Sequence, residues 1–593
     1  MVAALLPALT GCAWLGAGPG PEEVARDFLN QLASGGTEAA SRLTDDPDAA
    51  KKVLDQVRGA LNPTGVSLSL DEVREQDGDQ PTATGAFTAR WDLGHGRVWN
   101  YQGEVGLRTG ERGWQVRWAP SVVHPRLGNA QIIALRELTP DIAPVLDRDG
   151  VPLLSAENVV SVLLNRAKAG DLGQVSAALA GALARFDASI TAESISAGAA
   201  GTADGTDYLV VSLREADYQQ VKPAIYDLPG VRFTTQRRLL GADRDFGSQV
   251  LPALRATAEQ RTEGRAGFQI NTVNTGTGET VDELHAEPAR PAEALTTTLS
   301  QPVQAAAEAA VDPATQPAAL VAMRASTGEL LAVAQNAPAD QQGALALSGR
   351  FPPGSTFKIA TTVAALEAGL ATGDSPQPCP GATVIANRRI PNDNEFDKGT
   401  IPLRTAFALS CNTTFAQLAA NLPETALTEA AAKLGLGVDF VVTGATTVTG
   451  SVPPAGDVVE RAEDGFGQGK VLASPFGMAL VAATVAAGTM PTPTLLRGQT
   501  TQVSARPQAI APAILDQVRQ MMRDVVTDGT ARILADLPDV AGKTGTAQFG
   551  DGSNAHGWFV GYRGDVAVAV LLVGSGTSGP AVEAASRFLH ALP

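Results

Sequence analysis

The stretch Phe351 to Lys358 reads F-P-P-G-S-T-F-K, and its local chemistry decides how this part of the chain folds. The two prolines force an extended entry and Gly354 permits a sharp turn, so we expect a helix from Ser355 to Leu370. Positions i and i+3 share a helix face, which places Lys358 beside the Ser355 hydroxyl. In the first helical turn, free backbone N–H groups favour developing negative charge on Ser355.

A lysine beside a serine can act as a base only if its pKa is lowered. An apolar setting and a second cation both have that effect. Phe357, Ile359 and Ala360 supply the apolar setting, and Lys543 supplies the cation. The pattern therefore predicts a nucleophilic serine and a general base.

A second short pattern, S-C-N, spans Ser410 to Asn412 on a loop before an apolar stretch. In extended geometry residues i and i+2 point the same way, so we expect both side chains to face one cleft. There a hydroxyl can relay a proton, and a carboxamide can bind a peptide group.

A third pattern, K-T-G-T, spans Lys543 to Thr546 and opens a predicted strand. We expect Gly545 to leave room for a ligand that pairs with the strand edge. Lys543 with Thr544 and Thr546 is expected to bind a carboxylate.

Each pattern alone is weak, because Ser355 or Asn412 could be an ordinary helix cap and Lys358 a solvated helix residue. All three in this order are strong support for one site. The segment G-F-G-Q-G-K that ends at Lys470 resembles a phosphate loop, but Val471 stands where Ser or Thr is needed. We interpret it as a tight connection.

The elements around these patterns predict a multidomain α+β chain. The last 300 residues carry a hairpin at 320–334, strands at 540–548, 558–562 and 566–573, and a helix at 581–592. Early helices at 22–32 and 49–61 precede strands between 66 and 118. Residues 145–154 form a strand, a tight turn and a strand, followed by a mixed region to about 290 in which 196–204 is expected to be an exposed loop.

Composition narrows the function further. The net charge of -17 argues against nucleic acid as a partner. Neither the cysteines Cys12, Cys379 and Cys411 nor the five scattered histidines have metal-ligand spacing, so we expect no metal site and no cofactor. No G-x-S-x-G motif of a triad hydrolase occurs.

The N-terminal segment is apolar and leads into L-T-G-C at Leu9 to Cys12. The tetrad resembles a bacterial lipoprotein box, in which the cysteine becomes the lipidated first residue of the mature protein. The alternative is a truncated secretory signal or membrane anchor. Either interpretation places the chain at the outer face of the cell membrane.

Together, these motifs resemble those of class B penicillin-binding proteins, the monofunctional peptidoglycan DD-transpeptidases. Further matching segments are 295–308, 467–475 and 541–547. The resemblance implies an NTF2-like domain of the methicillin-resistance type at 21–123, a dimerisation or pedestal domain at 140–295 and a transpeptidase domain at 296–593. Residues 1–20 are then signal and linker. The implied transpeptidase fold, shared with serine β-lactamases, is an antiparallel sheet flanked by helices.

The resemblance also implies roles. Ser355 attacks the penultimate D-Ala carbonyl with Lys358 as base, and Ser410 relays a proton between Lys358 or Lys543 and the leaving amine. Asn412 holds the donor amide. The terminal carboxylate binds Lys543, Thr544 and Thr546, and the backbone N–H groups of Ser355 and Thr546 form an oxyanion hole. β-Lactams acylate Ser355, and glycosyltransferase, division or elongation proteins are the implied partners.

Outside the cytoplasm, Cys379 and Cys411 are expected to form a disulfide that fixes the loop of Ser410 and Asn412, the alternative being two buried thiols. The rival functions are a β-lactam-hydrolysing enzyme and a protein that binds β-lactams without transpeptidation. We find no Glu placed to activate a deacylating water, and every motif residue is present, so the transpeptidase is the preferred function.

Overall fold

The computed structural model describes residues 18–203, 205–550 and 552–593. The chain forms two compact units. One comprises Thr262–Ala292 and the described residues up to Asp141, and the other comprises Ile142–Arg261 and Glu293–Pro593. Cys12 and its apolar segment lie outside the described residues. Within the described ranges, no helix is both long and apolar enough to cross a membrane.

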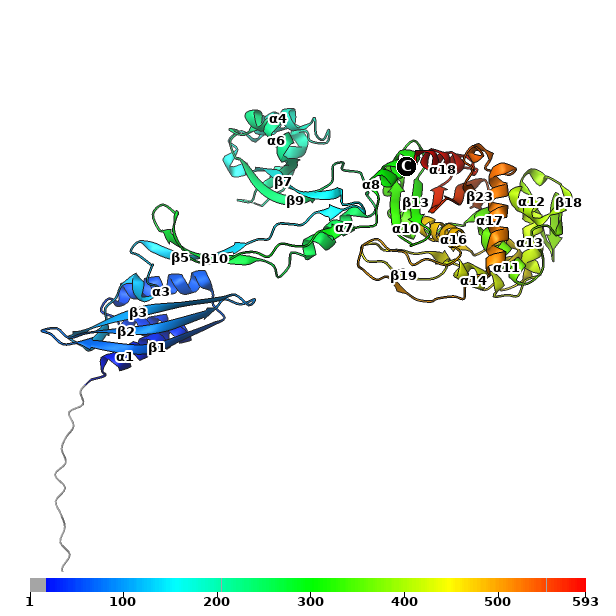
Figure 1. Cartoon of the computed structure of the whole chain (residues 1–593). Coiled ribbons are helices and arrows are strands. Elements are labelled where there is room, and N and C mark those ends of the chain that lie inside the picture. The colour runs from blue at the N-terminus through cyan, green and yellow to red at the C-terminus, as the bar shows by residue number, and fades with distance from the viewer. Residues whose placement is uncertain (1–17, 204, 551) are drawn as a thin grey trace, which may run out of the picture. The chain divides into compact units, whose positions relative to one another are not determined.

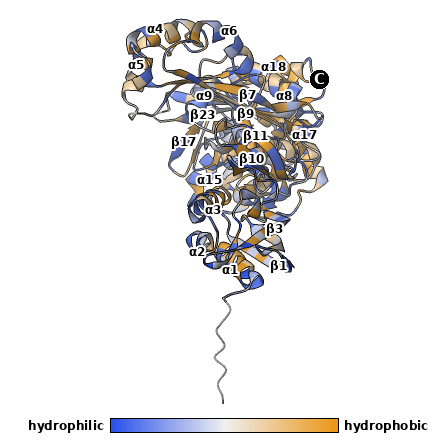
Figure 2. Ribbon diagram, turned by 90° about the vertical axis from the view of Figure 1, so that its left-hand side faces the viewer, coloured by the Kyte–Doolittle hydropathy of each residue, from blue (hydrophilic) through white to orange (hydrophobic). Residues whose placement is uncertain are grey.

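The first unit pairs three helices with a curved sheet. The helices are α1 (Pro21–Ser34), α2 (Thr37–Arg42) and α3 (Pro47–Leu61), and the strands run in the order β1 (Gly65–Gln76), β2 (Thr82–Asp92), β3 (Val98–Gly110) and β4 (Gly113–Val116). Figure 2 shows hydrophobic and hydrophilic residues intermixed along the helices. Their apolar faces bury Phe28 and Leu54 in one core with Phe87, Trp91 and Trp99 from the sheet. The strand aromatics are therefore core residues, as the alternating pattern predicts.

This unit extends beyond the boundaries expected from the sequence. A three-stranded sheet in the order β11 (Thr280–Glu287), β10 (Gly267–Asn274) and β5 (Gln131–Leu138) belongs to it. Phe268 and Ile270 of β10 share the core of Phe87 and Trp91. Residues 262–292 thus return to the first unit because their apolar side chains complete its core, a long-range contact that no local pattern predicts.

The second unit begins with a mixed α/β region around a long strand. Its strands are β6 (Val145–Leu146), β7 (Pro152–Leu164), β8 (Tyr208–Arg214), β9 (Val231–Leu240) and β12 (Leu295–Thr296), and its helices are α4 (Leu172–Leu183), α5 (Ala192–Ala200), α6 (Glu215–Ile225) and α7 (Leu251–Gln260). The prediction of an exposed loop at 196–204 is wrong for its first residues, because α5 extends to Ala200. Thr191 caps α5 with a reciprocal capping box, and Ile195 and Ala199 are buried.

The rest of the second unit is built on an antiparallel sheet in the order β14 (Leu330–Gln335), β13 (Ala318–Arg324), β25 (Val566–Leu572), β24 (Asn554–Arg563) and β23 (Val540–Phe549). The early hairpin and the late strands thus meet as expected. Helices α8 (Gln301–Val311) and α18 (Gly579–Ala591) pack together on the sheet, and α16 (Pro475–Ala487) packs against β13, β24 and β25 (Figure 1). Strand β23 is an edge strand.

The segments between these strands form the helical part of the domain. Its helices are α11 (Lys358–Glu367), α12 (Leu403–Ala408), α13 (Asn412–Ala420), α14 (Ala426–Lys433), α15 (Val458–Asp464) and α17 (Pro512–Thr527), with short α9 (Ala337–Asp340) and α10 (Leu345–Ser348). Small hairpins pair β15 (Pro376–Cys379) with β18 (Gly399–Pro402), and β16 (Ala382–Ile385) with β17 (Arg388–Pro391). The remaining pairs are β19 (Phe440–Val441) with β22 (Gln502–Val503), and β20 (Gly450–Ser451) with β21 (Leu472–Ala473). Helix α17 packs on β23, so helices and sheet meet beside that edge strand.

Candidate active site

Ser355 lies on a tight turn that leads into α11. The turn is a 3₁₀ helix over Gly354–Phe357, and the α-helix begins at Lys358 and ends at Glu367, so the expected helix from Ser355 to Leu370 is tighter at its start and shorter at its end. Gly354 has φ of 52°, and its N–H donates to the Gly467 carbonyl at 3.0 Å.

Gly467 is a support of this turn that the sequence reasoning missed. A Cβ there would lie 2.1 Å from the Gly354 carbonyl oxygen, so only glycine permits the contact. The G-F-G-Q-G-K segment is therefore more than a tight connection. Its glycine packs directly against the backbone that carries Ser355.

Lys358 is fully buried, and its ammonium group lies at the centre of the site. Its Nζ donates to Ser355 Oγ at 3.0 Å, to the Ser410 carbonyl at 2.8 Å and to Asn412 Oδ1 at 2.8 Å. Burial, and secondarily the charge of Lys543, holds the pKa of Lys358 well below its ordinary value. The i, i+3 spacing thus produces the predicted serine–lysine pair.

Lys543 is equally buried and lies on the other side of Ser410. Its Nζ donates to Ser410 Oγ and to the Thr544 carbonyl, both at 3.0 Å, and burial lowers its pKa to about 7. Lys358 Nζ lies 3.2 Å from the same Ser410 Oγ. The hydroxyl can accept from both lysines and still carry its own proton, which is the geometry of a relay.

The S-C-N segment is not extended, and that part of our prediction is wrong. Ser410 has φ of 63°, and Asn412 is the first residue of α13. The N–H of Ser410 donates to Phe407, and the N–H of Cys411 donates to Ala406, the pattern of a Schellman motif that ends α12. A left-handed serine costs about 1–2 kcal/mol, and this turn aims its hydroxyl between the two lysines.

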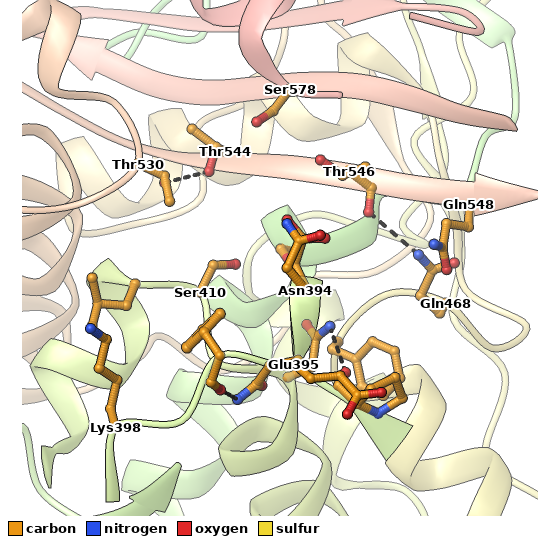
Figure 3. Close-up of a pocket in the computed structure, with 18 residues that line it drawn as sticks. Asn394, Glu395, Lys398, Ser410, Gln468, Thr530, Thr544, Thr546, Gln548 and Ser578 are labelled. Atoms are coloured by element: carbon orange, nitrogen blue, oxygen red, sulfur yellow. Dashed lines mark hydrogen bonds between the residues drawn. The ribbon is translucent and has the colours of Figure 1, made fainter. Parts of the chain in front are cut away.

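These residues surround a cavity of about 640 Å³. From the predicted set, Ser355, Ser410, Asn412, Thr544 and Thr546 line it. Lys358, Lys543 and Gly545 lie behind this lining. The residues that sequence reasoning missed are Thr530, Gln468, Gln548, Ser578, Leu409, Phe466 and the segment Pro391–Phe396 with Lys398, several of which are labelled in Figure 3.

Two expectations about K-T-G-T change with this geometry. The ammonium group of Lys543 points at Ser410 and not into the cavity. The cavity wall at this strand therefore carries hydroxyl groups, and the Thr544 hydroxyl forms a hydrogen bond of 2.6 Å with that of Thr530 (Figure 3). A Cβ on Gly545 would lie 2.8 Å from the Pro353 carbonyl and 2.9 Å from Thr356 Cγ2. Packing of the Ser355 turn on β23 therefore already requires glycine at this position.

Among the described residues, no strand pairs with the outer edge of β23, whose Thr546 and Gln548 line the cavity. The Gln468 amide reaches this edge, where it donates to the Thr546 carbonyl at 3.4 Å (Figure 3). Turned over, the same amide exchanges two hydrogen bonds with the backbone of Gln548, at 3.2 and 3.0 Å. A side-chain amide thus pairs with the strand edge as a peptide group does.

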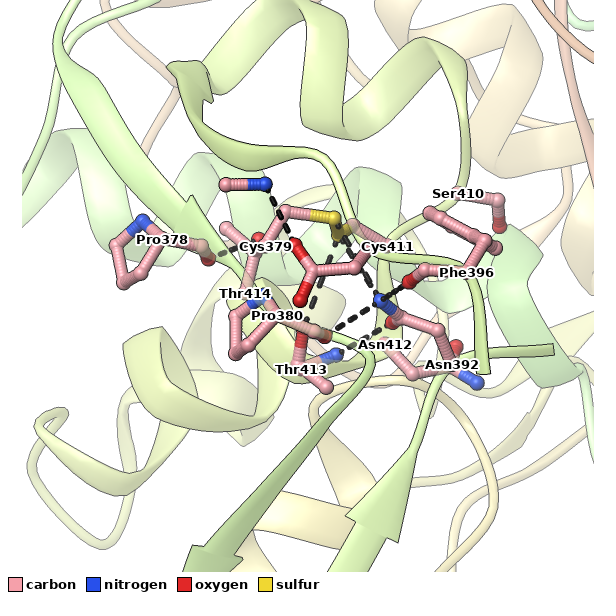
Figure 4. The surroundings of a disulfide bond; sticks show 12 residues. Pro378, Cys379, Pro380, Asn392, Phe396, Ser410, Cys411, Asn412, Thr413 and Thr414 are labelled. Carbon is pink, nitrogen blue, oxygen red and sulfur yellow. Dashed lines mark hydrogen bonds between the residues drawn. A yellow bond between two sulfur atoms is a disulfide. The ribbon is translucent and has the colours of Figure 1, made fainter. Parts of the chain in front are cut away.

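Cys379 and Cys411 form a disulfide in the structure, with their Cα atoms 6.2 Å apart (Figure 4). Both residues are fully buried. Asn392 lies against the two sulfurs. Its amide donates to the carbonyls of Pro380 and Phe396, both at 2.9 Å, while its oxygen accepts from the Thr413 N–H at 3.1 Å. The disulfide and Asn392 together join the cavity wall to the start of α13.

Among the described residues, no group of three or more His, Cys, Asp or Glu side chains is arranged to hold a metal ion. The groups that hydrogen-bond to one another around Ser355 are hydroxyls, two buried amines and an amide.

Known proteins share both the sequence and the fold of these parts. Residues 318–589 match the penicillin-binding protein transpeptidase domain, and residues 20–131 match the NTF2-like N-terminal transpeptidase domain. The peptidoglycan D,D-transpeptidase PbpA of Mycobacterium tuberculosis is 32% identical over 254 residues, which is 38% of this chain and 50% of that protein. PbpA of Mycolicibacterium smegmatis is 30% identical over 39% of this chain and 51% of its own. The match thus spans about half the length of these relatives.

Solved structures share the architecture at low identity. A penicillin-binding protein (PBP2) solved in complex with MreC from Helicobacter pylori has a TM-score of 0.60 and 17% identity, covering 77% of this chain and 98% of that one. A chain from a structure of a peptidoglycan synthase complex has a TM-score of 0.60 and 22% identity. The match covers 78% of this chain and 92% of that one. With its transpeptidase domain, its NTF2-like domain and its likeness to the PbpA enzymes, this chain belongs to the class B penicillin-binding proteins.

Proposed function

We propose that this chain is a peptidoglycan D,D-transpeptidase that cross-links stem peptides through an acyl-enzyme on Ser355. The observation that carries the proposal is the hydrogen-bonded series Ser355–Lys358–Ser410–Lys543, in which both lysines are fully buried. Burial lowers the pKa of such an amine, which makes it easier for the amine to be unprotonated and to take a proton from a hydroxyl.

In the acylation step, Lys358 removes the proton of Ser355 as its oxygen attacks the penultimate D-Ala carbonyl. The peptide C–N bond then breaks, and the terminal D-Ala amine leaves with a proton delivered through Ser410. The Ser410 hydroxyl lies 3.2 Å from Lys358 and 3.0 Å from Lys543, so either lysine can reprotonate it.

The groups on the cavity wall bind the donor peptide. The hydroxyls of Thr544 and Thr546 are offered to the terminal carboxylate, and the positive charge of Lys543 acts on it from behind the wall. The Asn412 amide binds the donor amide, and the backbone N–H groups of Ser355 and Thr546 stabilise the oxyanion. One such donor is worth about 100- to 1,000-fold in rate.

The second half-reaction returns Ser355 to its starting state. An amine of a neighbouring stem peptide attacks the ester carbonyl and forms a new amide bond. The ester C–O bond to Ser355 Oγ breaks, and the proton lost by the amine passes through Lys358 to that oxygen. A β-lactam mimics the donor, and its opened ring remains as an ester on Ser355. No metal or organic cofactor takes part in these steps.

The test is intact-protein mass after incubation with labelled penicillin, followed by assay with a D-Ala-D-Ala stem peptide and an amine acceptor. The wild type should carry one stable adduct, absent in Ser355→Ala, and should form a cross-linked product. Ser348→Ala is the matched control, because the Ser348 hydroxyl donates to the Ala344 carbonyl and Ser348 does not line the cavity. Rapid penicillin turnover with no adduct would instead indicate a β-lactamase. An adduct with no cross-linking would indicate a β-lactam-binding protein of another function.

Location and partners follow from the same function. We propose that the protein works at the outer face of the cell membrane, held there by a lipid on Cys12. Residues 296–593 would perform the chemistry, while 21–123 and 140–295 would space that domain from the membrane and dock partners from the synthesis machinery. The H. pylori PBP2–MreC complex and the peptidoglycan synthase complex support assembly of this kind.

A further inference from the structure

Asp464 carries a buried carboxyl group that the proposed mechanism does not use. It is the last residue of α15 and is 2% exposed. Burial raises the pKa of Asp464 to about 6, which shows that the charged form is costly at this position. Because an acidic group is expensive to bury, the contacts that it makes indicate what it does.

Those contacts are with the backbone of the segment that follows α15. The N–H of Lys470 donates to Asp464 Oδ1 at 2.7 Å, and the N–H of Gly467 donates to the Asp464 carbonyl at 2.8 Å. A Cβ on Gly469 would lie 2.1 Å from Asp464 Oδ1, so only glycine lets the chain pass this close to the carboxylate. The G-F-G-Q-G-K segment, residues 465–470, therefore turns around Asp464.

This segment contributes three groups to the catalytic site. Phe466 and Gln468 line the cavity, and the Gln468 amide also reaches the edge of β23. The Gly467 carbonyl accepts the N–H of Gly354, the residue directly before Ser355. A shift of the segment would therefore move the turn of Ser355 and part of the cavity wall together.

Buried side chains hold the segment at both of its ends. At the first residue, the buried hydroxyl of Thr361 on α11 donates to the Gly465 carbonyl at 2.7 Å. At the last residue, the Asp464 carboxylate accepts the backbone N–H of Lys470. The carboxylate thus closes the turn that Thr361 begins.

We propose that Asp464 is a positioning residue for Ser355, which acts by holding Gly467 and Gln468 in place. Asp464 does not line the cavity, so it acts through the segment and not on the substrate. Misplacing a reacting group by about 1 Å can cost about 100-fold in rate. This inference rests on the proposed acylation of Ser355 and adds to it a group that sets the position of that serine.

The opposite end of α15 offers a matched control. Asp457 caps the start of this helix, where its exposed side chain accepts the N–H groups of Val459 and Glu460 at 2.8 and 2.9 Å. Asp457→Ala removes hydrogen bonds from the same helix, at a cost of about 0.5–2 kcal/mol, and does not touch the 465–470 segment. Asp464→Asn is the conservative variant, because it keeps an oxygen that can accept the Lys470 N–H.

The first measurement is the rate constant for acylation of the full chain by labelled penicillin, at a pH well above the pKa of Asp464. Asp464→Ala should slow acylation about tenfold or more, and Asp464→Asn should recover most of that loss. Asp457→Ala should stay within about twofold of the parent. Equal rates in Asp464→Ala and the parent, equal losses in Asp464→Ala and Asp457→Ala, or no recovery in Asp464→Asn would overturn the proposal.

The second measurement is hydrogen exchange at Gly354, whose N–H is bonded to the Gly467 carbonyl. Exchange there should be faster in Asp464→Ala than in the parent and unchanged in Asp457→Ala. This measurement needs no acylation, so it tests the inference even if the parent forms no adduct, a result that would contradict the proposed function alone. Unchanged exchange at Gly354 in Asp464→Ala would overturn the inference.

Discussion

Removing the disulfide between Cys379 and Cys411 should lower the stability of the catalytic domain by a definite amount. The two cysteines are 32 residues apart in sequence. The chain-entropy relation then gives a loss of about 12 cal/mol/K from the unfolded state, or about 3.7 kcal/mol at room temperature. The double variant Cys379→Ala, Cys411→Ala also leaves small voids, since both sulfurs are fully buried, so 3.7 kcal/mol is the lower expectation.

The assay must report on the catalytic domain alone, because a chain of several domains does not unfold in one step. Protein equilibrated in urea would be exposed briefly to fluorescent penicillin, so that only molecules with a folded Ser355 site are labelled. The parent and the double variant give two midpoints, from which the difference in unfolding free energy follows. Reductant should lower the parent's midpoint and leave the double variant unchanged.

The reasoning fails if the denatured, unreduced protein contains free thiols from both cysteines. It also fails if the two midpoints correspond to less than about 1 kcal/mol, because the 32-residue loop would then be constrained by other contacts in the unfolded state.

Three further results are expected. Lys358 must be unprotonated to act as base, and its pKa is lowered by burial and, secondarily, by the charge of Lys543, so the acylation rate should fall as pH falls. Lys543→Gln should raise the pKa of Lys358, so the acidic limb of the plot of acylation rate against pH should move to higher pH. An acidic limb that does not move would contradict this. Gly467→Ala should slow acylation at least tenfold by displacing the serine turn, whereas Gly498→Ala, with similar φ but open space around it, should not. Asn392→Asp removes two N–H donors inside the fold and should cost about 1–3 kcal/mol in the urea assay, an unchanged midpoint being the contrary result.

The sequence determined the reactive core of this protein because that core depends on short spacings. Ser355 and Lys358 are three residues apart on one helical turn, and K-T-G-T lies on one strand, so local geometry suffices to pair the groups. The alternation of apolar residues likewise predicted the hairpin and the late strands of the sheet.

Only the tertiary structure decided what surrounds that core. Gly354 rests on Gly467, Thr530 meets Thr544, and β10 completes a core that begins more than 200 residues earlier, at Phe28. The backbone at Ser410 is likewise left-handed because α12 ends there, and the S-C-N sequence alone does not predict this. These features depend on contacts between segments that are far apart in the sequence. Burial of apolar surface decides which of these contacts form, and local residue spacing does not encode them.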